Sequence, residues 1–363
     1  MDTLCPAFEE TGNPVVCYPV ANYPLGVKAS WQPRQEGTGD PSPENVRTIV
    51  GLDSVQVTRC GKNQWNYTLD SYGRTWIIPF IPKGTYTFSA LSNADWWTGN
   101  SNRNKWYLRN EDSSQLIYTV AFNNTIINQR CYANVEIPYS GAFILATYSE
   151  QTVASVQDMQ VEVGSIATAY EPYQPGTTAT LTLPETIYGG TVDAVTGVGV
   201  ETWAYLVFDG TERWNSYNNP ITNKSQYGSA WAVNLPDIQQ GDNRVCTHFS
   251  TSNFPSWSGM ADNNFATDKR YIRVQSPIPT LDEWKSYLAA QYSAGTPVTI
   301  AYKLATPTTF QATGNAPIPA LPGTNTIYTD ADSVTVTGRA DPVRMIGRLS
   351  ERVAALENAA IAP

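Results

Sequence analysis

The sequence of 363 residues is poor in the side chains that most enzymes and metal sites use. It contains one histidine and five cysteines, and the cysteines are far apart with no CxxC pair among them. This spacing argues against a zinc site and against a disulfide framework. The cysteines are therefore expected to be reduced thiols, and a single bridge between Cys5 and Cys17 is the alternative.

Charge and long apolar segments are also scarce. Charged residues make up 15% of the chain and the net charge is −9. An acidic surface repels phosphate backbones, so no nucleic acid partner is expected. No stretch approaches the roughly 18 apolar residues that cross a bilayer, so no membrane insertion is expected. The first residues, MDTLCPAFEE, have no basic region and no apolar run, which predicts synthesis in a cytoplasm without a signal peptide.

Aromatic residues are abundant instead, at 12% of the chain, and 25 glycines and 25 prolines divide it into short segments. Segments such as GVKASWQPR and DSVQVTRC alternate apolar and polar residues between turn residues, which is typical of antiparallel strands. The sequence therefore predicts a mainly β, multidomain chain of antiparallel β-sandwich or jelly-roll architecture.

Two segments in the second half are more specific. LTLPETIYGGTVDAVTGVGVETWAYLVFDG predicts a meander of three strands joined by GG and TG turns. TLDEWKSYLAAQYSAG predicts a helix, because Thr280 and Glu283 form a capping box. Trp284, Leu288 and Tyr292 follow at i, i+4 and i+8, on one face.

Changes in composition along the chain predict five regions. They are a Pro-rich β region at 1–60, a jelly-roll domain at 61–174, a second β domain with one helix at 175–305, a Pro-rich β connector at 306–340, and a C-terminal oligomerisation helix at 341–363.

The last region has the pattern of a short coiled coil. Asp341 is the expected N-cap and Pro342 suits the first helical position. Apolar residues then recur at spacings of three and four, as in an a/d seam. The seam, of just over two heptads, is too short to be stable alone. A helix lying on its own domain is the alternative. The residues expected at the oligomer interface are Ile346, Leu349, Arg352, Val353, Leu356 and Glu357.

Little in the sequence indicates catalysis. The one histidine, His248, lies in a strand-like alternation, and no G-x-S-x-G, GxxxxGK[ST] or GxGxxG segment occurs. Carboxylate pairs can hydrolyse glycosides, but with 32 acidic residues such pairs arise by chance. We expect no enzymatic activity, no catalytic residue, no cofactor and no metal ligand. Structural calcium is the alternative, because Asp and backbone oxygens suit it. The carboxylate pairs that could serve glycoside hydrolysis are Asp330 with Asp332, Asp237 with Asp242, and Asp262 with Asp268.

Two stretches combine aromatic residues with amides and charges. Sugars present apolar ring faces, which indoles cover, and hydroxyl groups, which amide and charged side chains bind. The alternative for each aromatic residue is burial, which is expected for Trp106 and Trp214. Adjacent residues of an extended chain point to opposite faces, so at most one of Trp96 and Trp97 is buried. The carbohydrate-binding candidates are Trp96, Trp97, Asn100, Asn102 and Arg103 in the first stretch, and Tyr217, Trp231 and Trp257 in the second.

Several phrases occur in order between Gln35 and Asp341. They are QEGTGDPSPENVR followed by VTRCGKN, then VEVGSIATAYEPYQ, TIYGGTVDAVTGVGVETWAYLVFDG, YKLATPTTFQAT and LPGTNTIYTDADSVTVTGRADP. As a set they resemble tail proteins from phages and prophages of Firmicutes. VEVGSIATAYEPYQ resembles the closing strand of their jelly-roll, carbohydrate-binding-module-like domain.

This resemblance implies a structural virion protein of the fibre, baseplate or receptor-binding type, made in the bacterial host cytoplasm. It implies a homotrimer that contacts other tail or baseplate proteins, and no cofactor or reaction. Branched residues at a with leucine at d favour dimers. We expect a trimer, because so short a helix follows the symmetry of the β domains. With the aromatic candidates, the expected function is attachment to host surface glycans. A polysaccharide-degrading tailspike and a purely architectural tail component are the alternatives.

Overall fold

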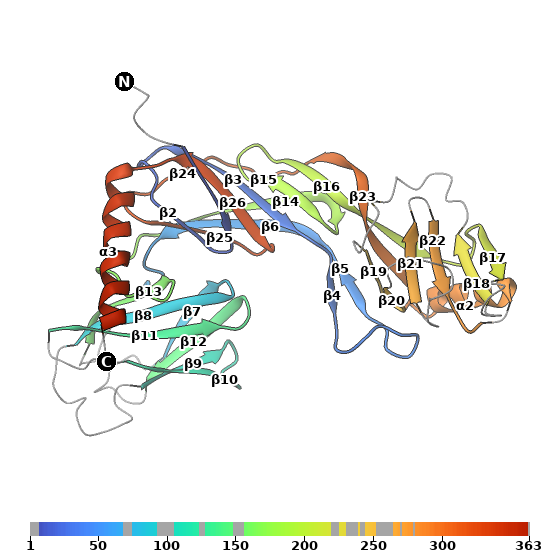
Figure 1. Ribbon diagram of the computed structural model, residues 1–363, viewed down its shortest axis with the longest axis horizontal. Coiled ribbons are helices and arrows are strands. Elements are labelled where there is room, and N and C mark those ends of the chain that lie inside the picture. The colour runs from blue at the N-terminus through green and yellow to red at the C-terminus, as the bar shows by residue number, and fades with distance from the viewer. Residues whose placement is uncertain are drawn as a thin grey trace.

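The computed structural model describes residues 7–67, 75–92, 105–122, 128–147, 156–218, 225–229, 239, 244–251, 264–268, 271–278 and 280–361. Within these ranges the protein is mainly β, and its strands pair antiparallel apart from one short parallel pair near residue 250. Figure 1 shows an elongated molecule with three parts. We call them the central body, the lateral unit beside one end of the body, and the distal unit at the opposite end.

The central body consists of two facing sheets. The larger sheet has the order β1 (Ala7–Gly12), β26 (Ser333–Arg339), β3 (Pro24–Trp31), β15 (Gly190–Asp193), β16 (Val198–Phe208), β23 (Val298–Gln311) and β19 (Arg244–Cys246), and β24 (Ile318–Pro319) pairs with β3. The smaller sheet has the order β14 (Thr177–Ile187), β6 (Leu52–Gly61), β25 (Asn325–Thr329) and β2 (Val15–Cys17). Val27 and Val336 of the larger sheet cluster with Val55 and Leu181 of the smaller, so one apolar core lies between them.

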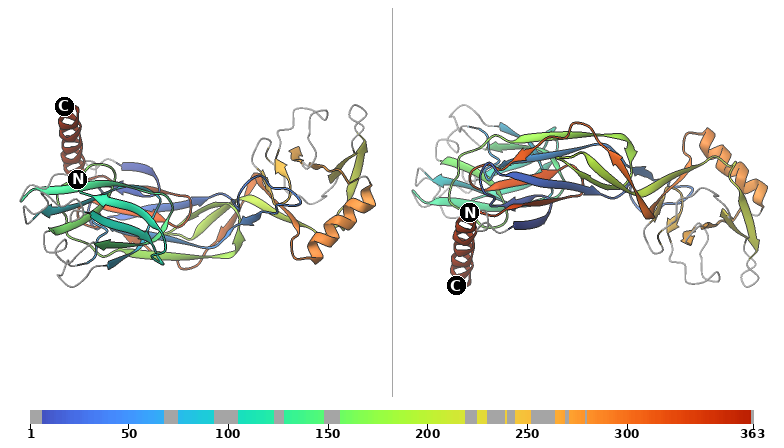
Figure 2. Two further views of the ribbon diagram at one scale, coloured as in Figure 1. Left: turned by 90° about the horizontal axis from the view of Figure 1, so that it is seen from below. Right: turned by 90° about the horizontal axis from the view of Figure 1, so that it is seen from above.

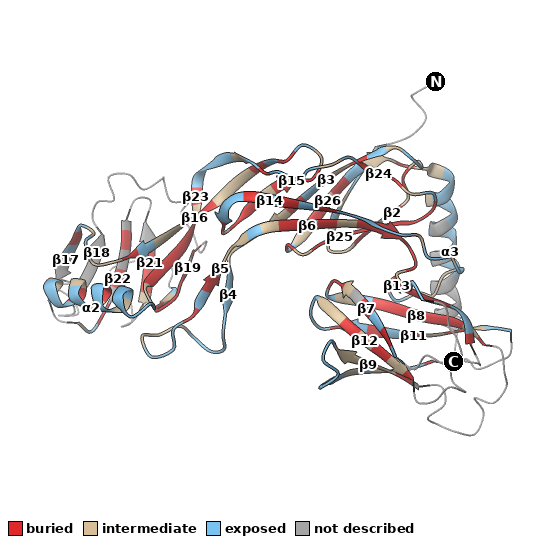
Figure 3. Cartoon of the chain, turned by 180° about the vertical axis from the view of Figure 1, so that it is seen from behind, coloured by how far each residue is buried: buried red, intermediate tan, exposed pale blue. Residues whose placement is uncertain are grey.

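The alternation of apolar and polar residues explains this core. Every second residue of β3 is buried, from Leu25 to Trp31. Val55 and Val57, which the alternation in DSVQVTRC places on one face of a strand, are both fully buried. The inner faces of the sheets are correspondingly red in Figure 3. A period of two therefore decides which side of each strand meets the core.

Strands from distant parts of the chain are neighbours in this body. β3, β15 and β26 lie side by side in the larger sheet, although they come from the regions 1–60, 175–305 and 306–340. The predicted meander forms only in part. β15 and β16 pair across the TG turn as expected, but β14 does not pair with β15. β14 instead pairs with β6 in the opposite sheet, where Ala179 and Leu181 are buried.

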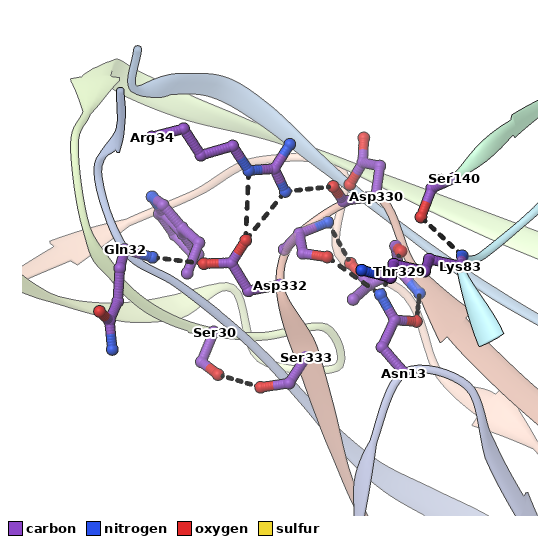
Figure 4. A network of polar contacts seen from close by, with 12 residues as sticks. Asn13, Ser30, Gln32, Arg34, Lys83, Ser140, Thr329, Asp330, Asp332 and Ser333 are labelled. Carbon is purple, nitrogen blue, oxygen red and sulfur yellow. Dashed lines mark hydrogen bonds and ion pairs between the residues drawn. The ribbon is translucent and has the colours of Figure 1, made fainter. Parts of the chain in front are cut away.

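Polar side chains tie these distant segments together (Figure 4). Asn13, in the turn after β1, donates to the carbonyl oxygens of Thr329 and Ala331 at 2.9 and 3.0 Å and accepts from the Thr329 amide at 3.1 Å. Its side chain thus satisfies three backbone groups at the turn between β25 and β26. The first strand and the last two strands are held at one point, some 300 residues apart in the sequence.

In the described part of the region 61–174, the lateral unit contains seven strands. β10 (Leu116–Ala121), β9 (Lys105–Asn110), β12 (Gly141–Thr147) and β7 (Thr75–Ile81) form one sheet, and β11 (Arg130–Ile137), β8 (Gly84–Ser92) and β13 (Val156–Val163) form the other. Both sheets contribute to one buried cluster. Trp106 is fully buried there, stacked on Trp76 at 5.5 Å, which confirms its prediction as a core residue.

The distal unit holds a sheet of β17 (Trp214–Asn218), β18 (Ser225–Ser229), β22 (Tyr271–Gln275), β21 (Asn264–Asp268) and β20 (Ser250–Thr251), with α2 (Leu281–Ser293). The long pair β16 and β23 reaches into it from the central body, because Phe208 and Ile300 join its core. Trp214 is buried, as predicted.

Helix α2 begins as the sequence predicts. The Thr280 hydroxyl accepts from the Glu283 amide at 3.3 Å and donates to the Glu283 carboxylate at 2.8 Å. Trp284 and Leu288 are fully buried, but Tyr292 is exposed, which corrects its placement on the same face. Eight residues along a helix of 3.6 residues per turn bring a side chain about 80° round the axis.

Helix α3 (Pro342–Ile361) is the last element and follows β26 directly. Figure 2 shows it standing away from the sheets of the body. The Asp341 carboxylate accepts from the amides of Val343 and Arg344 at 3.1 and 3.2 Å, which confirms Asp341 as the N-cap. Neither α2 nor α3, the described helices, is long and apolar enough to cross a membrane.

Candidate functional site

The carbohydrate-binding candidates from the sequence are not placed by this structure. Their identity as binding residues stays a prediction. Trp96, Trp97, Asn100, Asn102, Arg103, Trp231 and Trp257 lie outside the described residues, and Tyr217 is described only by its backbone in β17.

Asp330 and Asp332, one of the carboxylate pairs considered, hold strands together (Figure 4). One Asp332 oxygen accepts from Arg34 at 3.0 and 3.2 Å, and the other accepts from the Gln32 amide at 2.7 Å. Asp330 accepts from the Gln56 amide at 2.8 Å, and its burial raises the pKa of its carboxyl. The two side chains therefore join β26 to β3 and β25 to β6. Asp237, Asp242 and Asp262 lie outside the described residues, and Asp268 is described only by its backbone.

His248 and the described cysteines are buried. The Nδ1 atom of His248 lies 2.8 Å from the Thr247 hydroxyl, and burial lowers the pKa of the imidazole. Cys17, Cys60, Cys131 and Cys246 are free thiols, and Cys5 lies outside the described part of the chain. Burial raises the pKa of the Cys131 thiol to about 11. No group of three or more potential metal ligands occurs within the described ranges.

The predicted seam of α3 is exposed in the single chain. Ile346, Leu349 and Val353 are 63%, 56% and 52% exposed. Leu349 also lines, with Val16 and Ile166, a pocket of about 510 Å³ between α3 and the sheets. The side chains of Arg352, Leu356 and Glu357, the other residues expected at the interface, lie outside the described part. A row of apolar side chains on a projecting helix is a surface that another chain can cover.

A second surface lies where the lateral unit meets the central body. Two adjoining pockets of about 370 and 230 Å³ share Asn66 and Tyr173, and we call them together the junction groove. Its walls come from β6 and the segment after it, strands β7 and β13, the start of β14 and the segment before it, and Tyr328 of β25. Boundaries between structural units are common positions for ligand sites.

Aromatic rings dominate the junction groove. Tyr67, Tyr170 and Tyr173 all line it and are between 38% and 40% exposed. The hydroxyl group of Tyr67 donates to the Ile77 carbonyl at 2.7 Å, which fixes that ring. In the smaller pocket Phe80 stacks on Tyr328 with 5.7 Å between ring centroids. Aromatic side chains from several elements thus line the groove.

A β-bulge supplies the polar wall. The register of β13 against β8 shifts between Gln157 and Gln160, and Asp158 within the shift has a φ of 52°. Asn63 donates to the Met159 carbonyl at 3.1 Å and accepts from the Val161 amide at 3.1 Å. Arg130 donates to the Asp158 carbonyl at 2.9 Å. The bulge is therefore held from both sides in a backbone conformation that non-glycine residues seldom adopt.

Anchored neighbours also position Tyr170 and Tyr173. Glu171, between them, donates its amide to Gln160 at 2.9 Å and accepts from the Thr324 hydroxyl at 3.2 Å. The Arg130 guanidinium lies 5.5 Å from the centroid of the Tyr170 ring, a cation–π distance. Although this segment is irregular, both rings flank an anchored residue.

Two buried donors at the groove have no acceptor among the described residues. They are Nε2 of Gln64, which lines the smaller pocket, and Nε1 of Trp65, which lines the larger one. Buried polar groups are normally hydrogen-bonded, so each such donor needs a physical explanation. Both donor atoms are almost completely covered by the protein, so neither is open to the groove.

Sequence reasoning did not identify the junction groove. Its residues lie near positions 58–67, 78–80, 156–178 and 328, and no local pattern connects them. One signal was present in AYEPYQ, where two tyrosines flank a proline in a segment without strand periodicity. Comparisons with family models, curated proteins and solved structures found no match to this chain.

Proposed function

We propose that this protein is a non-enzymatic structural component of a phage tail, of the fibre or receptor-binding type, that attaches the particle to host surface glycans. The observation that carries this proposal is the exposed apolar seam of α3 at one end of an elongated β molecule. The ordered set of phrases that resembles tail proteins of Firmicutes phages supports it. In this proposal the lateral unit is the jelly-roll domain that resembles a carbohydrate-binding module.

The proposed assembly is a homotrimer in which α3 forms a short parallel coiled coil. Burying a leucine side chain fully is worth about 1.5–3 kcal/mol. Leu349 is 56% exposed, so covering it adds roughly 1–1.5 kcal/mol per chain. Such a seam orients chains whose β parts also touch. Three copies per fibre raise avidity for weakly bound glycans by effective concentration. The other partners would be tail or baseplate proteins, and the location the virion.

Light scattering of the full-length protein tests the assembly. We expect a trimer at micromolar concentration. Leu349→Asp should raise the dissociation constant of the trimer at least tenfold, because three carboxylates would meet at the seam. Ala354→Asp adds the same charge at an exposed position that points away from the a/d seam and should leave the trimer intact. A monomeric wild-type protein, or equal effects of the two substitutions, contradicts the proposal.

Adsorption of the labelled protein to Firmicutes cells tests attachment. We expect binding without release of soluble sugar from the cell surface. Sugar release would favour the polysaccharide-degrading tailspike. A trimer that adsorbs to no cell carrying surface glycans would favour the purely architectural alternative.

A further inference from the structure

We propose that the junction groove is a binding site for a short, uncharged oligosaccharide. This inference rests on the proposed attachment to glycans and assigns it to a place that none of the sequence candidates occupies. It depends on four properties of the groove: its exposed rings, its exposed amide side chains, its charge and its rigidity.

The exposed rings match the apolar faces of a sugar. Tyr67, Tyr170 and Tyr173 each expose about two fifths of their surface at one place. Tyrosine has an apolar face and a polar end, which suits a ligand with ring C–H faces and hydroxyl groups. A pocket of about 370 Å³ falls within the usual size range of small-molecule sites.

The polar groups of the groove match sugar hydroxyls. The exposed side chains of Asn66 and Gln157 line the larger pocket, and each amide supplies two donors and one acceptor. A site that supplies such groups discriminates against ligands that leave them unpaired.

The charge of the groove distinguishes between classes of glycan. Asp158 is the one charged side chain among the residues that line the two pockets. No lysine or arginine lines either pocket in the described part of the chain, and cationic side chains are what phosphate recognition typically uses. Polyol phosphates are therefore disfavoured, and neutral sugars are the class that fits.

The groove is held in shape before any ligand binds. Asn63 and Arg130 fix the bulge at Asp158, and Glu171 fixes the segment that carries Tyr170 and Tyr173. A site that is already ordered loses less conformational entropy on binding. A strained bulge that is pinned on both sides is also the kind of feature that re-aims a side chain at a site.

Titration calorimetry on the full-length oligomer tests the proposal. The probes are glucose, galactose, rhamnose, N-acetylglucosamine and their disaccharides, with polyglycerol phosphate as the anionic comparison. We expect at least one neutral saccharide to bind. Tyr170→Ala and Tyr173→Ala should each weaken it at least tenfold, and Asn66→Ala about fivefold. Tyr118→Ala is the matched control, because Tyr118 is 38% exposed on β10, away from the groove. Tyr173→Phe keeps the ring and should retain binding within about threefold.

Each outcome decides a different claim. If saccharides bind wild type and the groove variants equally well, the groove is the wrong place, whereas the proposed attachment to glycans stands. If polyglycerol phosphate binds in the groove more tightly than every neutral probe, the ligand class is wrong. If labelled wild-type protein binds neither the saccharides nor host cells, the proposed function fails and this inference with it. Asn66→Ala changes an exposed side chain, so it keeps the test decisive if a tyrosine variant does not fold.

Discussion

Asn13→Ala should loosen the central body at one end while leaving the lateral unit unchanged. Asn13 makes three hydrogen bonds with the backbone of Thr329 and Ala331. Both partner residues are buried, so water cannot readily replace the lost amide. The substitution therefore removes the contacts and also leaves buried backbone groups without a partner.

The expected magnitude follows from these contacts. A typical hydrogen bond contributes about 0.5–1.5 kcal/mol net, and a buried group left unpaired costs about 1–3 kcal/mol. Because the three bonds share one site and relax together, we expect a total loss of about 2–4 kcal/mol. At 1.4 kcal/mol per factor of ten, this corresponds to a loss of protection from hydrogen exchange of roughly 30- to 700-fold.

Hydrogen exchange with mass spectrometry is the suitable assay, because a protein of several parts does not give one unfolding free energy. Peptides from β25 and β26 should lose protection, and peptides from β8 and β11 should not. Asn45→Ala is the control: Asn45 also donates to two carbonyls, those of Thr38 and Asp40, at 3.2 and 3.0 Å, but in an exposed loop. Asn45→Ala should lower the free energy of opening by no more than about 1 kcal/mol, and only in this loop.

Two results would refute this reasoning. Equal effects of Asn13→Ala and Asn45→Ala would show that burial of the partner groups does not matter at this turn. An equal loss of protection in β8 and β11 would show that the lateral unit and the central body open as one, although their cores are separate clusters.

Two further predictions concern pH. Burial lowers the pKa of His248 in the folded protein, whereas the imidazole of the unfolded chain takes up a proton near pH 6.5. Below that pH the unfolded chain binds more protons than the folded protein, so the distal unit should lose stability as pH falls below about 6.5. His248→Gln should remove this dependence in hydrogen exchange of α2 between pH 7.5 and 5.5, and an unchanged dependence would contradict the assignment. Burial raises the folded pKa of Asp330, so ionisation of this carboxyl weakens the fold as pH rises above its unfolded value of about 3.9. Asp330→Asn keeps an oxygen for the Gln56 amide and should raise the thermal midpoint at pH 7 but not near pH 3. A lower midpoint at pH 7 would show that the attraction between the Asp330 carboxylate and Arg34 outweighs the cost of burying that carboxylate.

Local patterns predicted several features that the structure bears out. The alternation around Val55 and Val57 places both in the core, because successive side chains of a strand point to opposite faces. The N-caps at Thr280 and Asp341 form because each needs only residues within one helical turn. Trp106 and Trp214 are also buried as predicted, and that prediction needs only the strand pattern of a few neighbouring residues.

The junction groove could not be predicted in this way. Tyr67, Tyr170 and Tyr328 are separated by more than 100 residues at each step, and no short-range rule relates them. The bulge at Asp158 was equally hidden, because a register shift is a property of the β13–β8 pair and not of β13 alone.

Local patterns in the sequence are enough to predict that the chain is mainly β, which faces of its strands are apolar, where two helices begin, and that the last helix carries a row of apolar residues. These properties depend on neighbours within a few residues, where side-chain period and capping chemistry act. Local patterns do not predict that β3, β15 and β26 share a sheet, that β14 crosses to the opposite one, or that three tyrosines meet at one groove. The physical reason is that strand partners and register are chosen by packing and hydrogen bonding between distant segments. The bonds from Asn13 to Thr329 and Ala331 are the example that hydrogen exchange can test.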